Sequence, residues 1–160
     1  MRVMFVLAVV AATGMAFGQS LSLKPVTAQY VTVTSGVDGL VRPGGRVVLW
    51  VLVTPNPGKR VYAAGARDFQ PVALVMTPHA AITSMRPAYP QSELDANSGG
   101  STPVPVYRQP FRIAVPIVVS PTAKHGETLT LGAAINYQAC DDRLCYPAAS
   151  IPVLWTLSTL

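Results

Sequence analysis

Charged residues, cysteines and long apolar segments are all scarce in this 160-residue chain. Only 12% of its residues are charged, about half the usual fraction, which excludes a coiled coil and a highly charged disordered protein. Two cysteines are too few for a miniprotein built on disulfides or for a four-cysteine zinc site. No apolar run after residue 20 is long enough to span a membrane, which excludes a multispan transporter.

The positive charge of the chain is spread along the sequence. The formal net charge is +5, but no run of basic residues with interleaved aromatics occurs. The sequence therefore predicts a mildly basic surface and no nucleic acid partner.

The first 18 residues have the pattern of a secretory signal peptide. Arg2 supplies the positive start, residues 3–17 are almost entirely apolar, and small residues at Ala16 and Gly18 suit a signal peptidase. We place cleavage after Gly18, which leaves residues 19–160 as one domain, periplasmic or secreted, with no remaining membrane span. An uncleaved membrane anchor is the alternative, although the stretch is short for one.

The rest of the sequence alternates apolar and polar residues with a period of two, which is typical of strands. Turn signals rich in proline and glycine separate the strand candidates. We expect nine short strands, over residues 29–35, 47–53, 60–63, 71–77, 82–85, 104–108, 111–119, 128–137 and 150–157. This pattern predicts an all-β, immunoglobulin-like sandwich, which we expect to be a monomer.

Three finer expectations follow from the same pattern. The continuously apolar segment 47–53 predicts a strand that is buried on both faces. Pro116 cannot donate a ladder hydrogen bond, so its strand is expected at an edge or with a bulge. The segment from Tyr89 to Pro103 has no strand character, and a loop that long is either padding or functional.

The strongest chemical signal is the pair Cys140 and Cys145, which directly follows the most regular strand. A disulfide here would close a small ring, which stabilises a fold by only about 2 kcal/mol. An exchangeable redox disulfide, a static staple and a metal site all remain open. Arg143 would favour a thiolate, whereas Asp141 and Asp142 would disfavour it, so the sequence does not give the direction of the thiol pKa shift.

The segment Ile135 to Pro147, with the sequence INYQACDDRLCYP, resembles the N-terminal periplasmic domain of the thiol:disulfide interchange protein DsbD. That family has a strand ending in a similar Tyr-Gln-Ala-Cys, a short polar insert, a second cysteine and a proline. Weaker similarity in residues 58–62 and 86–90 extends the resemblance to about residues 27–157. Unlike the family, this sequence contains no membrane or thioredoxin-like part, so an electron donor would act in trans.

The resemblance implies an immunoglobulin-like domain that passes reducing equivalents by disulfide exchange, without a cofactor. Cys145 would form the mixed disulfide with a client, and Cys140 would resolve it. The donor would be a thioredoxin-like or membrane-embedded thiol reductase, and the clients would be periplasmic proteins such as disulfide isomerases or cytochrome c maturation factors. The expected supporting side chains are Tyr62, Asp141, Asp142, Arg143 and Tyr146, and Tyr89 or Leu94 would replace the aromatic of the family's cap loop.

Two other function classes remain open. The domain could be a non-catalytic interaction module in which a static disulfide orders one corner. Met76, His79 and Met85 are soft or borderline metal ligands close in sequence and could bind copper. Methionines in apolar strands are more often core residues, so we expect no metal site. A serine hydrolase is not supported, because no G-x-S-x-G motif occurs.

Overall fold

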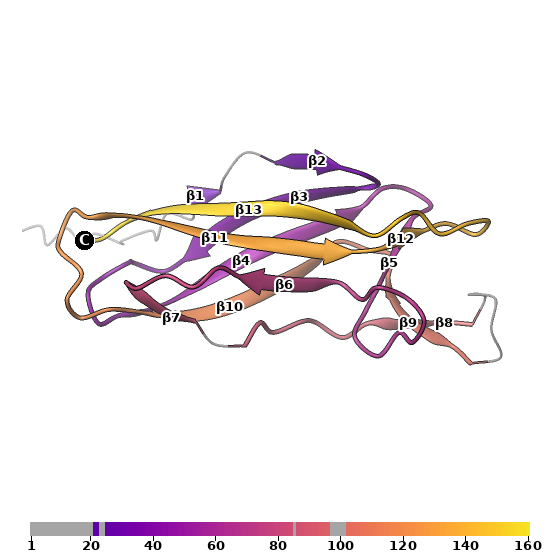
Figure 1. Cartoon of the computed structure of the whole chain (residues 1–160), viewed down its shortest axis with the longest axis horizontal. Helices are drawn as coiled ribbons and strands as arrows, with labels where there is room; N and C mark the ends of the chain where they lie inside the picture. The colour runs from indigo at the N-terminus through magenta and orange to yellow at the C-terminus, as the bar shows by residue number, and fades with distance from the viewer. Residues whose placement is uncertain (1–20, 23–24, 85, 97–101) are drawn as a thin grey trace, which may run out of the picture.

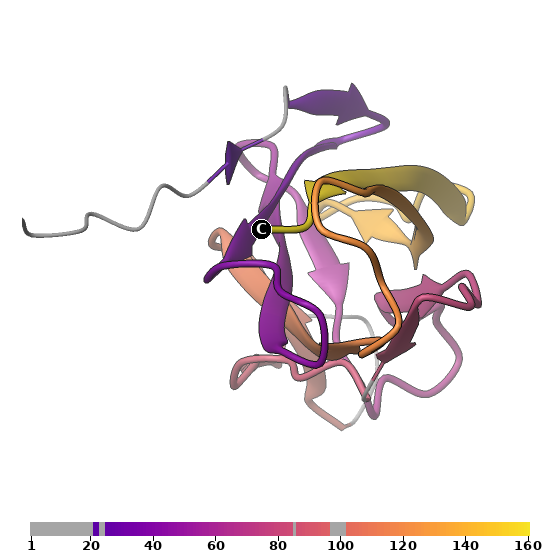
Figure 2. The ribbon, with the colours of Figure 1, turned by 90° about the vertical axis from the view of Figure 1, so that its left-hand side faces the viewer.

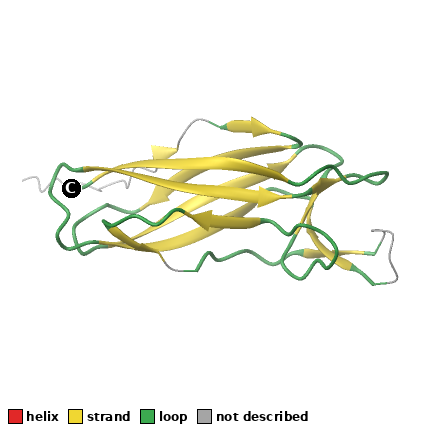
Figure 3. Ribbon diagram, in the orientation of Figure 1, coloured by secondary structure: helices red, strands yellow, loops and turns green. Residues whose placement is uncertain are grey.

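The computed structural model describes residues 21–22, 25–84, 86–96 and 102–160. Within these ranges the chain forms antiparallel strands and loops, and no helix (Figures 1 and 3). The expected signal peptide and its cleavage point lie outside the described residues. The described ranges contain no helical segment that could cross a lipid bilayer.

The largest sheet forms one side of the molecule. Its order is β1-β3-β4-β10-β7, and β2 also pairs with β3. These strands are β1 (Leu21–Ser22), β2 (Val26–Ala28), β3 (Val31–Asp38), β4 (Arg46–Pro55), β7 (Ile82–Ser84) and β10 (Phe111–Val119).

A three-stranded sheet packs against it, with β11 in the centre between β13 and β6. Its strands are β6 (Ala73–Met76), β11 (Thr128–Tyr137) and β13 (Ala149–Ser158). The core lies between the two sheets, as the end-on view in Figure 2 indicates. Trp155 of β13 is fully buried there and donates its indole N–H to the carbonyl of Gly36, 3.0 Å away.

A third sheet of four short strands, in the order β12-β5-β9-β8, lies at the end of the molecule away from the C-terminus (Figure 1). Its strands are β5 (Arg60–Tyr62), β8 (Glu93–Asp95), β9 (Val104–Tyr107) and β12 (Ala139–Cys140). This small sheet positions the two cysteines.

The predicted fold class is confirmed, and each of the nine predicted strands overlaps an observed one. The four strands that the sequence did not predict are β1, β2, β8 and β12. Each has only two or three residues, which is too few for a period of two to be recognised.

The three finer expectations have different outcomes. The segment from Tyr89 to Pro103, expected to have no strand character, contains β8. Strand β4 is fully buried on one face only, because Val48, Trp50 and Leu52 on its other face remain half-exposed. The Arg112 guanidinium lies over the Trp50 ring, 4.8 Å from its centre, and covers part of that face. Strand β10, which contains Pro116, lies inside its sheet and not at an edge. Its pairing with β7 stops at Ile117 and resumes only at the Ala114–Ala88 bridge, so the interruption around Pro116 fits the second alternative, a bulge, and not the edge position.

The inward face of β11 packs into the core between the two sheets, which predicts a strong effect of truncating Leu131, whose side chain is fully buried. Leu131→Ala should lower the free energy of unfolding by about 2 to 5 kcal/mol, because it removes buried methyl groups and leaves a cavity. Urea unfolding followed by tryptophan fluorescence measures this. The neighbouring Thr130 is exposed on the outer face, so Thr130→Ala is the matched control and should change the value by about 0.5 kcal/mol or less. Equal effects of the two variants would contradict the burial pattern.

Candidate functional site

The two faces of the small sheet have different roles. Val61, Tyr107 and Ala139 belong to the main core and anchor one face. Because side chains alternate along a strand, the other face presents Cys140 and Tyr62, which cluster with Val106. The register places Cys140 of β12 opposite Arg60 of β5. The anchored face thus fixes the position of the face that holds the cysteine.

The second cysteine is brought back by a tight hairpin. The Asp141 N–H donates to the Leu144 carbonyl at 3.0 Å, and the Tyr146 N–H donates to the Ala139 carbonyl at 2.9 Å. Cys145 therefore lies directly opposite Cys140, with 4.0 Å between the Cα atoms, and the two form a disulfide.

The two halves of the disulfide differ in access. Cys140 is 0% exposed, whereas Cys145 is an exposed residue. An attacking thiolate from another molecule would therefore reach Cys145 more readily than Cys140.

The hydroxyl of Tyr62 contacts the exposed cysteine, Cys145. The hydroxyl oxygen lies 3.4 Å from the Cys145 sulfur, and because a disulfide has no S–H, the hydroxyl is the donor. Tyr62 is 1% exposed and stacks on Phe69, with 3.9 Å between the ring centres. Burial raises the pKa of Tyr62, despite the opposing effect of Arg60, so the hydroxyl keeps its proton at neutral pH.

An ion pair holds the loop between the cysteines. The Lys59 ammonium lies 2.7 Å from Asp141 Oδ2 and 2.7 Å from the Tyr146 hydroxyl. The Tyr146 hydroxyl also donates to Asp141 Oδ2 at 2.7 Å. Tyr146 stacks on Tyr30, with 3.7 Å between ring centres, and Lys59 lies over both rings.

The carboxylate of Asp141 is strongly stabilised in its charged form. Lys59 is the largest cause of its lowered pKa, followed by the Tyr146 hydroxyl and the backbone N–H groups of Leu144 and Arg143. The same contact, together with the bond to Tyr146, raises the pKa of Lys59. Asp141 is therefore occupied as a loop anchor and is poorly suited to accept a proton during exchange.

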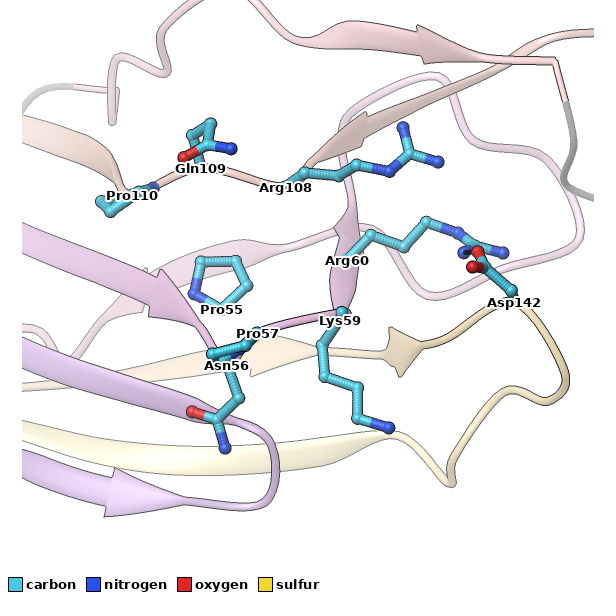
Figure 4. A pocket seen from close by; sticks show the side chains of 10 residues that line it. Pro55, Asn56, Pro57, Lys59, Arg60, Arg108, Gln109, Pro110 and Asp142 are labelled. Atoms are coloured by element: carbon cyan, nitrogen blue, oxygen red, sulfur yellow. Dashed lines mark hydrogen bonds and ion pairs between the residues drawn. The ribbon is translucent and has the colours of Figure 1, made fainter.

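Two arginines and three carboxylates form a second charged group beside the disulfide. Arg60 lies 3.0 Å from Asp142 in the cysteine loop and 3.0 Å from Asp95 in β8. Arg108 lies 2.8 Å from the same Asp95 oxygen and 3.3 Å from Glu93. Arg60, Arg108 and Asp142 line a cavity of about 370 Å³ together with Pro55, Asn56, Pro57, Gly58, Lys59, Gln109 and Pro110 (Figure 4).

The structure brings most of the predicted site residues together and places others apart. Tyr62, Asp141 and Tyr146 surround the cysteine hairpin, and Asp142 is joined to it through Arg60. The Arg143 side chain is exposed; its backbone N–H donates to Asp141.

The described contacts of the two expected cap residues do not include the cysteines. The Tyr89 hydroxyl accepts the backbone N–H of Leu74, and Leu94 of β8 is 70% exposed. The aromatic beside the site is Phe69, from the loop after β5. Gln138 links that loop to the hairpin, because its amide accepts the Gln70 N–H and donates to the Tyr146 carbonyl.

Several site residues had only a weak sequence signal. Lys59 and Arg60 directly precede the predicted strand tyrosine, but nothing local indicates their distant carboxylate partners. Phe69 lies in a loop without periodicity, so its stacking on Tyr62 could not be found from the pattern.

Two of the three soft ligands considered for copper, Met76 and His79, lie among the described residues. Met76 ends β6, and the His79 ring accepts the backbone N–H of Ala81. Met85 lies outside the described residues. In the described part of the chain, no three His, Cys, Asp or Glu side chains are grouped to hold a metal ion.

No protein-family model and no curated protein matches this sequence. Solved structures that are similar in fold include the following two. The N-terminal periplasmic domain of ScsB from Proteus mirabilis aligns with a TM-score of 0.52 and 12% identity, over 88% of this chain and 52% of that chain. The GAE domain of GGA2p from Saccharomyces cerevisiae aligns with a TM-score of 0.50 and 9% identity, over 86% of this chain and 98% of that one.

At such low identities the similarity is one of fold, and this chain spans about half the length of the ScsB chain. The β-sandwich and the Cys140–Cys145 disulfide together fit a DsbD-type domain. They support a role related to thiol–disulfide chemistry. The GAE domain shares the fold at a similar TM-score, so the role must be argued from the cysteine site.

The contact between the Tyr62 hydroxyl and Cys145 predicts that this hydroxyl lowers the pKa of the Cys145 thiol when the disulfide is reduced. In a Cys140→Ser background, adding Tyr62→Phe should raise the pKa of Cys145 by about one unit, because a hydrogen bond to a charged group contributes about 1.5 kcal/mol or more. Thiolate absorbance against pH measures the shift. Tyr107→Phe is the matched control, since Tyr107 is also buried in this sheet but bonds the Pro90 carbonyl. An unchanged Cys145 pKa would contradict the assigned hydrogen bond.

The lowered pKa of Asp141 predicts a pH-dependent contribution to stability. A carboxyl of this kind stabilises the native state above its unfolded-state pKa of about 3.9, and the contribution is lost as the pH falls toward the folded-state pKa. The urea midpoint of wild type should exceed that of Asp141→Asn by a constant amount above about pH 5. The difference should shrink on further acidification. A difference that does not depend on pH would contradict the ionic role of Asp141.

Proposed function

We propose that this protein is a periplasmic thiol–disulfide exchange module that passes reducing equivalents through Cys140 and Cys145 to exported thiol proteins. The observation that supports this most directly is the unequal access of the disulfide, with Cys140 buried and Cys145 exposed against the Tyr62 hydroxyl. An exported location suits a persistent disulfide, and one structural neighbour is a periplasmic domain.

The exchange proceeds in two balanced steps. In the reduced module, the Cys145 thiolate attacks a client disulfide, forms a mixed disulfide and releases one client sulfur as a thiol. The Cys140 sulfur then loses its proton and attacks Cys145, which closes the internal disulfide and releases the second client thiol. Two electrons and two protons pass from the module to the client.

The cycle needs an external reductant. A dithiol protein, either thioredoxin-like or a membrane-embedded thiol reductase, attacks the closed disulfide at Cys145 and regenerates the two thiols by the reverse steps. Direction is set by the relative reduction potentials of donor, module and client.

The surroundings of the ring favour opening without unfolding. Cys140 is held in β12 by pairing with β5, and the loop is held by the Lys59–Asp141 ion pair and by two backbone bonds to Asp141 Oδ1. These contacts do not involve the S–S bond. The fold therefore does not depend on that bond to keep the two sulfurs close together.

The test uses single-cysteine variants and a model disulfide substrate such as insulin. Cys140→Ser should accumulate a stable mixed disulfide, because the resolving sulfur is missing, whereas Cys145→Ser should form none. Non-reducing electrophoresis and the mass shift after alkylation measure the adducts. Both variants should retain the wild-type circular dichroism spectrum.

The reduction potential separates exchange from a static staple. A potential well above about −300 mV is expected for an exchangeable pair. A lower potential, or reduction only on unfolding, would overturn the proposal and identify a non-catalytic interaction domain with a structural disulfide.

A further inference from the structure

The cavity beside the cysteine loop has a charge arrangement that the exchange chemistry does not use. Strand pairing of Val61 with Tyr107 places Arg60 beside Arg108. Two adjacent cations repel each other. Among the described residues, the buried carboxylate that contacts both guanidinium groups is Asp95, which is 2% exposed. The remaining negative charge comes from the surface, since the side chains of Asp142 and Glu93 are 91% and 50% exposed.

We propose that this cavity is a docking subsite for a carboxylate side chain of the partner protein that exchanges disulfides with Cys145. In the unbound protein, Asp142 occupies the subsite through its 3.0 Å contact with Arg60. This inference rests on the exchange function proposed above, and it specifies the partner as an acidic segment.

The contact made by Asp142 is of the kind that an incoming carboxylate can replace. Asp142 is almost fully exposed and is bound to Arg60 through one oxygen. The Asp142 carboxylate is already well solvated, so its release costs little, and an incoming carboxylate restores the charge pairing of Arg60. Arg60 itself is buried by the surrounding chain and stays in place as a fixed donor.

The walls of the cavity suit a defined subsite. Pro55, Pro57 and Pro110 lie on the side away from the guanidinium groups, and Lys59 points away from Arg60 toward the loop anchor (Figure 4). Proline rings hold the backbone rigidly, so the cavity does not need ordering before an acidic side chain enters. Lys59 is already bonded to Asp141, which leaves Arg60 and Arg108 as the recognising cations.

The subsite lies within a short peptide's reach of the reacting sulfur. Cys140 is the direct ladder neighbour of Arg60, and the Cα atoms of Cys140 and Cys145 are 4.0 Å apart. Paired strand residues are about 5 Å apart, so the Arg60 and Cys145 backbones are separated by about 10 Å. An extended chain covers this distance in about three residues. The partner's acidic residue is therefore expected about three positions from its reacting cysteine.

The experiment measures how fast Cys145 reacts with activated peptides. In the full chain carrying Cys140→Ser, the Cys145 thiolate attacks the cysteine of a peptide activated as its 2-thiopyridyl disulfide. A peptide disulfide forms and 2-thiopyridone leaves, which absorbance records. Three of the peptides are identical except at the position three residues from the cysteine, which is Glu, Gln or Lys. A fourth carries the Glu eight positions away.

The expected result is a local preference for the acidic peptide. The Glu peptide should react about three- to fivefold faster than the Gln peptide at low salt, as expected for a partly exposed ion pair, and the Lys peptide should react most slowly. Adding Arg108→Gln should reduce the Glu-to-Gln rate ratio toward one. Adding Asp142→Ala should increase it by freeing Arg60.

A charge-matched control variant distinguishes binding at this cavity from general electrostatic attraction between the peptide and the protein. Glu127 directly precedes β11, and its carbonyl accepts the Thr159 N–H near the C-terminus, which lies at the end of the molecule away from the small sheet (Figure 1). Glu127→Gln removes one negative charge, as Asp142→Ala does. The subsite is overturned if both variants raise the rate ratio equally. It is also overturned if the near and distant Glu peptides react equally fast, or if Glu and Gln peptides do not differ.

Failure of the proposed exchange function would give a different result from failure of the subsite. If none of the peptides reacts, the proposed exchange role is wrong, and the subsite is tested by binding alone. A Glu peptide with serine in place of cysteine should shift the amide NMR signals of Arg60, Arg108 and Asp142. Unshifted signals would overturn the subsite, whatever the outcome for exchange.

Discussion

The pairing of β5 with β12 on one side and β9 on the other is the constraint on which the site depends. Only one face of this small sheet reaches the main core, through Val61, Tyr107 and Ala139. Strand alternation then forces Cys140, Arg60 and Tyr62 onto the opposite face. The burial of one set of side chains thus fixes where the reactive set lies, and no separate scaffold is required.

The sequence predicted the long strands well because each has enough residues for alternation to be recognised, as in β10 and β11. It also located the cysteine hairpin, through a motif contained in a few consecutive residues. It could not predict the surroundings of that hairpin. The partners of Arg60 come from β8 and from the cysteine loop, and long-range pairing of this kind leaves no local pattern.

The expected cap illustrates the same limit. A long polar segment after Tyr89 looked like a loop that could cover the cysteines, but part of it pairs with β9 as β8 and supplies Asp95. An aromatic that the pattern did not indicate, Phe69 in the loop after β5, stacks on Tyr62. The adjacent Gln70 N–H donates to Gln138 just before β12, which ties that loop to the segment that leads to Cys140.

The energetics of the ring support the proposed exchange over a static staple. A ring of about six residues removes little entropy from the unfolded chain, about 2 kcal/mol, whereas a ring of about 60 residues would remove about twice as much. A sandwich with a continuous core between two sheets gains most of its stability elsewhere. The loop is already held by Lys59, Asp141 and Tyr146. A disulfide that adds little stability and leaves one sulfur exposed is better suited to opening and closing than to holding the fold.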